Sequence, residues 1–153
     1  MRRSRSTSSA LAAVAVAAAA WLGWQALWAR GGDRELPWRD LTGRTLAAPQ
    51  RSQLATFGGE TALRAALGPS ATVPSIDFER RRAVLVAAGP RSSTAYALEV
   101  VRVREERRRI VVTIRERAPT LANPGAATLA FPFRLLTIER SGKPVELAWE
   151  GRP

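Results

Sequence analysis

Cysteine and histidine are absent from the 153 residues of this chain, which contains a single lysine, Lys143. Without cysteine the chain can form no disulfide and no zinc–thiolate site, has no thiol nucleophile and cannot carry the lipid anchor of a lipoprotein. Without histidine a Ser-His-Asp triad is impossible. A Ser–Lys pair would need Ser141 and Lys143, which lie in an expected turn where a lysine is normally solvated and protonated. These absences predict a protein that is not an enzyme.

Paired carboxylates could also act as an acid and a base. The candidates are two neighbouring pairs, Asp77 with Glu79 and Glu105 with Glu106. Each pair is followed by arginines, so solvated ion pairs are the simpler interpretation. The sequence also contains no phosphate-binding glycine loop and no cluster of metal-ligating residues. We therefore expect no cofactor, no metal site and no small-molecule substrate.

Positive charge is abundant. The formal net charge is +11, and every basic residue except Lys143 is arginine. Four of the 24 basic residues lie at or before Arg30 and all 13 acidic residues follow it, which leaves 20 minus 13, or +7, on the remainder. No recognised nucleic-acid-binding motif accompanies this charge, so we expect no nucleic-acid partner.

The first 29 residues have the pattern of a membrane anchor. Residues 1–9 form a basic, serine-rich head, and residues 10–29 form an apolar run interrupted only by Gly23 and Gln25. A helix of about 20 residues is about 30 Å long, the thickness of a bilayer core. Tryptophans at the end of the run are typical of the membrane–water interface (Trp21, Trp24 and Trp28). We expect a single-pass protein with a cytoplasmic N-terminus and a domain outside the cytoplasm, in the periplasm or the extracellular space.

The alternative is a signal peptide that is removed after export. The alanines at 18–20 offer small residues for cleavage, but the mature chain would then begin with an exposed Trp-Leu-Gly-Trp. A cut after Ala29 would place Leu27 three residues before the cut, where small residues are preferred. The uncleaved anchor is therefore the preferred prediction, and secretion after cleavage is the alternative.

The rest of the chain is predicted as a polar linker over residues 30–49 and one β domain over residues 50–153. Ile110, Val112 and Ile114 alternate with other residues, as in a half-buried strand. A helix over 60–67 should begin with an acidic residue and end at Gly68-Pro69. Strands are predicted over 50–57, 83–88, 96–104, 109–116, 131–138 and 144–149.

The stretch 82–116 is interpreted as a meander of three successive strands, with a hairpin loop at 105–108. One face of such a sheet has to be covered by a second layer. The predicted fold is therefore mainly β, an antiparallel sheet that is sandwich- or half-barrel-like, with one short helix and a preceding transmembrane helix.

A series of short motifs resembles the C-terminal domain of the protease complex subunit PrcB family over residues 73–149. The motifs, in order, are Ile76-Asp77-Phe78, Val84-Leu85-Val86, Gly89-x-Arg91 to Tyr96, Leu98-Glu99-Val100, 110–114, Pro124-Gly125, Pro132-Phe133 and 143–146. Where the family has Thr-Gly-Gly-Tyr before the second strand, this chain has Ser93-Thr94-Ala95-Tyr96.

The resemblance implies a non-catalytic accessory domain outside the cytoplasm that binds an envelope protein, for which a protease is one candidate. A protease-inhibitor-like module that uses the 89–96 loop is one alternative. An envelope structural protein held by a basic face is another, and its binding should fade with salt.

Two groups of residues are candidates for binding a partner. The first is the loop that follows the apolar strand 83–88, because loops on a rigid sheet often carry recognition. Its candidate residues are Gly89, Arg91, Ser93, Thr94 and Tyr96. The second is a basic rim that would form if the 105–108 hairpin lies beside the start of strand 83–88. Its residues are Arg80, Arg81, Arg82, Arg107, Arg108 and Arg109.

Overall fold

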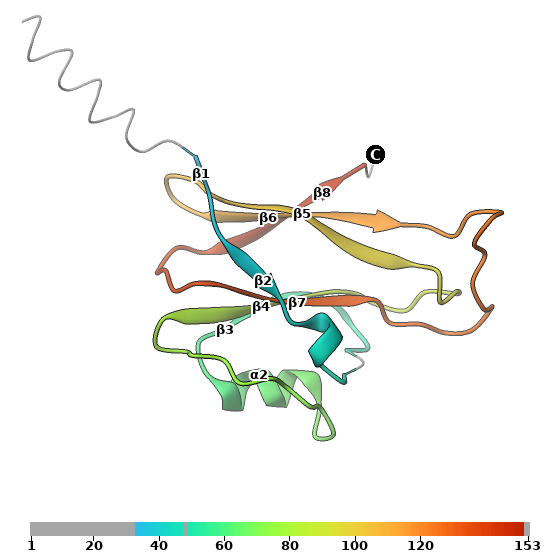
Figure 1. Cartoon of the computed structure of the whole chain (residues 1–153), viewed down its shortest axis with the longest axis horizontal. Coiled ribbons are helices and arrows are strands. Elements are labelled where there is room, and N and C mark those ends of the chain that lie inside the picture. The colour runs from blue at the N-terminus through green and yellow to red at the C-terminus, as the bar shows by residue number, and fades with distance from the viewer. Residues whose placement is uncertain (1–32, 48, 152–153) are drawn as a thin grey trace, which may run out of the picture. The chain divides into compact units, whose positions relative to one another are not determined.

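The computed structural model describes residues 33–47 and 49–151. Their strands form two four-stranded sheets, which face each other (Figure 1). The elements, in order, are β1 (Arg34–Glu35), β2 (Trp38–Asp40), the 3-10 helix η1 (Thr42–Arg44), β3 (Ser52–Phe57), α2 (Glu60–Leu67), β4 (Arg81–Ala88), β5 (Ala97–Glu105), β6 (Ile110–Arg117), β7 (Phe133–Glu139) and β8 (Val145–Glu150).

The outer sheet has the strand order β1-β5-β6-β8. β5 and β6 form the predicted antiparallel hairpin, interrupted by a bulge between Val100 and Arg102. β8 pairs with β6 in parallel, so the sheet is mixed rather than purely antiparallel. Ile110, Val112 and Ile114 of β6 are fully buried, which confirms the alternation expected from the sequence.

The inner sheet has the order β2-β7-β4-β3, and all of its pairs are antiparallel. It lies between the outer sheet and α2, so it is covered on both faces (Figure 1). Towards the outer sheet, β4 packs Val84 and Val86 into one core, and towards α2 it packs Ala83 and Leu85 into another.

The helix α2 has the predicted bounds, Glu60–Leu67. Leu63 and Leu67 lie four residues apart on one face and are buried against the inner sheet. The helix ends at Gly68, whose φ of +103° suits glycine and whose N–H donates to the carbonyl of Arg64.

The expected three-strand meander is wrong in one respect, because β4 does not pair with β5. β4 lies between β3 and β7 in the inner sheet, whereas β5 belongs to the outer sheet. The reason lies in its sequence, which is apolar without alternation from 83 to 88. Such a run fits a strand that is buried on both faces.

The predicted linker over 30–49 also differs from the structure in its described part. β1 pairs with β5 and β2 pairs with β7, so this short segment crosses from one sheet to the other. Leu36 and Leu41 are each 4% exposed and contribute to the two cores. Residues 34–44 are therefore part of the domain.

The predicted head and transmembrane helix, residues 1–29, lie outside the described residues. Within the part of the chain that is described, no helix has the length and apolar character needed to cross a bilayer.

The strands give the domain two distinct ends. One end holds the start of β1, the β5–β6 hairpin, the β7–β8 turn and the start of β4. The opposite end holds the loops 89–96 and 118–132, on the right of Figure 1. A strand of eight residues, such as β4 or β6, separates the two ends by about 26 Å.

Candidate functional site

The loop 89–96 and the longer loop 118–132 form one unit, which we call the loop lobe. Arg91 and Ala130 exchange two backbone hydrogen bonds, of 2.8 and 2.9 Å. The N–H of Thr94 donates to the carbonyl of Ala126 at 3.1 Å, and the N–H of Ala126 donates to the Thr94 hydroxyl at 2.9 Å. The two loops thus continue the pairing of the strands to which they are attached.

Ser93 and Gly125 make the closest approach inside the loop lobe. The Ser93 hydroxyl donates to the carbonyl of Pro124 at 2.6 Å and accepts from the N–H of Ala95 at 3.1 Å. Gly125 has a φ of +67°, and a Cβ atom there would lie 2.6 Å from the Ser93 Oγ and from the Ala95 nitrogen. Only glycine fits this position without a shift of backbone or side chain.

Arg91 fixes the base of the loop lobe. Its guanidinium forms an ion pair with Glu116 and donates to the carbonyls of Ala88 and Pro90, each at 3.0 Å. The hydrogen bond to Glu116 is the main reason why the pKa of Arg91 is raised. The same guanidinium lies 6.0 Å from the centre of the Tyr96 ring, at the outer limit of a cation–π contact.

These contacts give the predicted loop residues mainly supporting positions. Gly89 has a φ of +79° and packs on Ser52 of β3, and Ser93 is 8% exposed. Tyr96 is half-buried. No non-glycine residue of the described chain has a positive φ, so Ser93-Thr94-Ala95-Tyr96 adopts its conformation without the family's two glycines.

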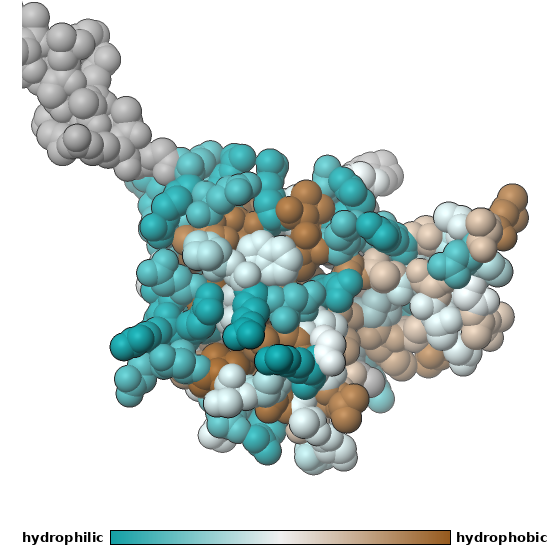
Figure 2. Space-filling view, viewed as in Figure 1, coloured by the Kyte–Doolittle hydropathy of each residue, from teal (hydrophilic) through white to brown (hydrophobic). Residues whose placement is uncertain are grey.

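Most exposed residues of the loop lobe lie in the other loop, 118–132, although Pro90, Ser92 and Thr94 of the loop 89–96 are also exposed. From 118 to 133 the chain has no charged side chain. Thr120 and Asn123 pair through two backbone hydrogen bonds, of 3.1 and 3.0 Å, so the chain reverses tightly between them. Leu121, inside this turn, is fully exposed, and Leu129 is 65% exposed. Figure 2 shows the projecting right-hand surface in pale and brown colours, whereas teal dominates the opposite side.

The sequence pattern predicts residues 118–127 only as a connecting loop. The signal that points to it is the long interval without charge in a chain whose charged fraction is 24%. The exposure of the two leucines cannot be predicted from the sequence, because an apolar loop residue can also be buried against the domain.

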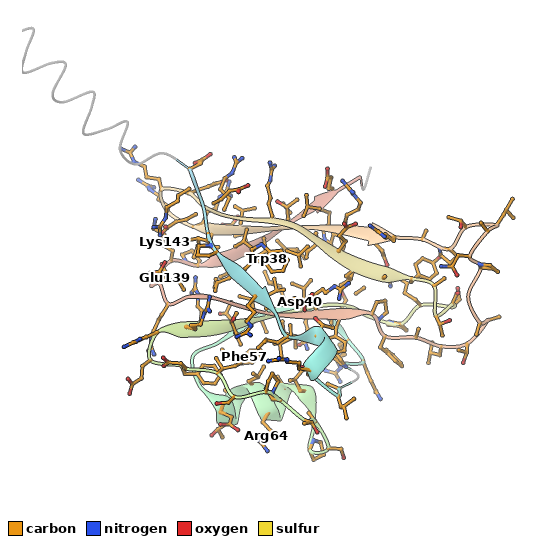
Figure 3. The ribbon with its side chains drawn as sticks, in the orientation of Figure 1. Trp38, Asp40, Phe57, Arg64, Glu139 and Lys143 are labelled. Atoms are coloured by element: carbon orange, nitrogen blue, oxygen red, sulfur yellow. The ribbon has the colours of Figure 1, made fainter. Side chains whose placement is uncertain are left out.

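The predicted basic rim is divided between two elements at the other end of the domain. Arg80–Arg82 lead into β4, and Arg107–Arg109 belong to the β5–β6 hairpin. Lys143 connects them, since its carbonyl accepts from Arg82 at 2.8 Å and its Nζ donates to the carbonyl of Glu106 at 2.8 Å. In Figure 3 Lys143 and Glu139 lie at this end, away from the loop lobe.

Acidic residues neutralise Arg109 of the rim and the basic residues beside the rim, Lys143 and Arg34. Glu105 lies 3.0 Å from Lys143 and 2.9 Å from Arg34, and the hydrogen bond from Lys143 is the main reason why its pKa is lowered. Arg109 pairs with Glu106 at 2.6 Å and with Glu146 at 2.7 Å. The rim is therefore a network that joins the two sheets as well as a charged surface.

The groups considered for acid–base chemistry are engaged in this network or exposed. The Lys143 Nζ contacts Glu105 and the Glu106 carbonyl. The backbone N–H of Lys143 donates to the Ser141 hydroxyl at 3.2 Å. Asp77 and Arg80 approach only to 3.9 Å. In the described ranges, 33–47 and 49–151, no three His, Cys, Asp or Glu residues are grouped as a metal site would require.

Comparison with known proteins identifies one family. Residues 82–139 match the family model described as PrcB C-terminal. The match begins in β4 and ends at the last residue of β7, so it contains the β5–β6 hairpin and both loops of the loop lobe. No curated protein and no solved structure matches the chain.

Proposed function

Residues 82–139 belong to the PrcB C-terminal family, and from this premise we propose that the chain is a non-catalytic interaction domain. It is anchored in the cell membrane by residues 10–29, lies outside the cytoplasm and binds an envelope protein, for which a protease is one candidate. The loop lobe forms the binding surface. The observation that supports this most is the full exposure of Leu121 in a turn that hydrogen bonds hold in one conformation.

The apolar character of this surface favours a protein with an apolar pocket as the partner. Burial of a leucine side chain stabilises a complex by about 1.5–3 kcal/mol, and a few residues usually contribute most of the binding energy of an interface. Leu121 and Leu129 lie in the same loop, which has no charge that would have to be desolvated. Backbone hydrogen bonds join this loop to the loop 89–96, so little ordering of the chain is required on binding.

A protease-inhibitor-like module is the second candidate, and the tight exposed turn between Thr120 and Asn123 favours it. The loop 89–96 is less suited to enter an active-site cleft, since Ser93 is buried and Arg91 is held by Glu116. An inhibitor of this kind would insert Leu121 and its neighbour Ala122. Its binding would then block substrate access to the protease, whereas an accessory subunit would leave the active site open.

The test is crosslinking in intact cells followed by purification of the full-length chain from membranes. The variant is L121S/L129S, and the matched control is Leu46→Ser, because Leu46 is also exposed, at 73%, but lies outside the loop lobe. We expect one envelope protein to be recovered with the wild type and with the control, and to be lost from the double variant.

Two results would contradict the proposal. Recovery of the same partner in equal amount with L121S/L129S would move the binding surface away from the loop lobe. Absence of any specific partner from all three samples would remove the interaction function itself. If a protease is recovered, its activity on a peptide substrate with and without the domain separates an accessory subunit from an inhibitor.

A further inference from the structure

Three turns at the end of the domain opposite the loop lobe form a continuous surface, which we call the basic ridge. They are residues 80–82 before β4, residues 106–109 of the β5–β6 hairpin and residues 140–143 between β7 and β8. The N–H of Arg140 donates to the carbonyl of Arg80 at 2.8 Å, and the Nζ of Lys143 reaches the carbonyl of Glu106 at 2.8 Å. The basic ridge therefore runs from the inner sheet to the outer sheet.

The charge of the basic ridge is concentrated in its turns. These three segments contain eight basic residues and one acid, Glu106. The acids that pair with Lys143 and Arg34 lie in strands and not in the turns. They are Glu105, the last residue of β5, and Glu139, the last residue of β7. The exposed basic side chains of the turns are Arg80, Arg107, Arg108, Arg109 and Arg140.

The chain enters the domain at this same end. Arg34 begins β1 and pairs with Glu105, next to the β5–β6 hairpin. Ala29, the last residue of the apolar run, is five residues before Arg34. An extended chain covers at most about 3.6 Å per residue, so these two residues can be no more than about 18 Å apart. A membrane span over 10–29 would hold the basic ridge near the bilayer surface.

We infer that the basic ridge docks on anionic lipid head groups of the membrane that anchors the chain. The inference rests on the proposed anchor and adds an orientation to it: the basic ridge faces the lipid, and the loop lobe points away from it. Guanidinium groups suit this contact, because each presents several N–H donors to phosphate oxygens. With strands of about 26 Å between the two ends, the loop lobe is presented to proteins rather than to lipid.

The absence of cysteine makes a direct test possible, since any introduced cysteine is unique. The full-length chain carries a fluorescent label at Gly142→Cys, in the basic ridge, or at Ala122→Cys, in the loop lobe. Gly142 has open space at its Cβ position, and Ala122 is exposed. Each protein is reconstituted into vesicles of phosphatidylcholine alone or with about 30% phosphatidylglycerol, together with a quencher attached to a lipid head group.

The charge dependence is tested with two matched variants. R80Q/R108Q/R140Q removes three exposed arginines from the basic ridge, and R44Q/R51Q/R102Q removes three exposed arginines elsewhere. The label at 142 should be quenched more strongly in anionic than in neutral vesicles, and the label at 122 should not. Because one arginine near an anionic surface changes binding about five-fold, the first variant should lose the difference and the second should keep it.

The inference is overturned if the label at 122 is quenched as strongly as the label at 142, or if R80Q/R108Q/R140Q behaves as the wild type does. Failure of the anchor itself gives a different result, namely that the chain does not float with neutral vesicles. In that case flotation with anionic vesicles tests the basic ridge separately from the anchor. The wild type should float with these vesicles, and the triple variant should not. The wild type should also be released from the vesicles in about 0.5 M salt.

Discussion

The two ends of this domain are built on opposite principles. The loop lobe contains a loop without charge that is fixed by backbone hydrogen bonds and exposes two leucines. The basic ridge is rich in arginine and is held by ion pairs and by Lys143. Several hydrogen bonds between two loops fix one conformation, whereas ion pairs that are partly open to solvent contribute little to stability and remain available to other charges. The comparison indicates that the loop lobe is preorganised for a defined partner and that the basic ridge suits a less specific surface.

The largest difference between the ends is expected for a glycine-to-alanine change. At Gly125 an alanine would need a positive φ, and its Cβ would overlap with Ser93 and Ala95. We expect Gly125→Ala to lower the free energy of unfolding by about 2–4 kcal/mol. Gly142→Ala, in the basic ridge, has open space and should change it by less than about 0.5 kcal/mol.

Urea denaturation of both glycine variants checks this difference, with hydrogen exchange at the amides of Thr94 and Ala126 as a local readout. Protection of these amides should fall in Gly125→Ala and stay unchanged in Gly142→Ala. Equal stability of the two variants would show that the two loops are not locked together.

Serine-to-alanine changes should show the same contrast on a smaller scale. Ser93 is buried and makes two hydrogen bonds, so Ser93→Ala should cost about 1–2 kcal/mol. Ser141 accepts one hydrogen bond, from Lys143, at a partly exposed turn, and Ser141→Ala should cost no more than about 0.5 kcal/mol. Denaturant midpoints of the two variants give the comparison. A larger loss of stability for Ser141→Ala than for Ser93→Ala would contradict the claim that hydrogen bonds contribute more to stability in the loop lobe than in the basic ridge.

Acid should affect the ion pairs behind the basic ridge. The pKa of Glu105 is lowered in the folded protein, chiefly by the hydrogen bond from Lys143 and further by Arg34. Its contribution is therefore fully present above the unfolded-state value of about 4.3 and is lost as the pH falls through the lowered pKa. Glu105→Gln should reduce stability near neutral pH by up to about 1 kcal/mol and flatten the acid limb.

Urea midpoints between about pH 2.5 and 6 measure this effect, with Glu60→Gln as the control, since Glu60 is an exposed helix residue paired with Arg64. A wild-type acid limb that is unchanged in Glu105→Gln would mean that Glu105 is not held by Lys143 in solution.

The smallest effect on stability is expected at the tip of the loop lobe. Leu121 is fully exposed, so its side chain contributes no packing to the fold. Leu121→Ser should change the free energy of unfolding by less than about 0.5 kcal/mol and still weaken partner binding. Thermal denaturation and the cellular crosslinking assay measure the two quantities, and a destabilised variant would show that the leucine packs against the domain.

Local patterns in the sequence predict much of this fold. The spacing of Leu63 and Leu67 and the following Gly68 give α2, and the alternation of Ile110, Val112 and Ile114 gives β6 and its hairpin. These features depend on residues close in sequence. The order of the motifs along the chain also gives the resemblance to the PrcB family, and the family match over residues 82–139 confirms it.

Long-range pairing explains what the sequence did not reveal. Leu36, Trp38 and Leu41 are scattered among polar, glycine and proline residues, so nothing local marks β1 and β2 as strands. The pairing of Ser93 with Pro124 joins residues 31 positions apart, and the predicted loop residues therefore proved to support a second loop. The basic rim was expected from the run of arginines, but the pairing of Arg109 with Glu146 of β8 joins residues 37 positions apart.

One measurement tests the opposite roles of the two ends most directly. A photo-crosslinking amino acid is placed at position 121 or at position 108 of the full-length chain, and the adducts formed in intact cells are analysed by mass. We predict adducts with one envelope protein from position 121 and adducts with lipid from position 108. Protein adducts from position 108 alone, or lipid adducts from position 121, would contradict the assignment of the loop lobe to a protein partner and of the basic ridge to the membrane.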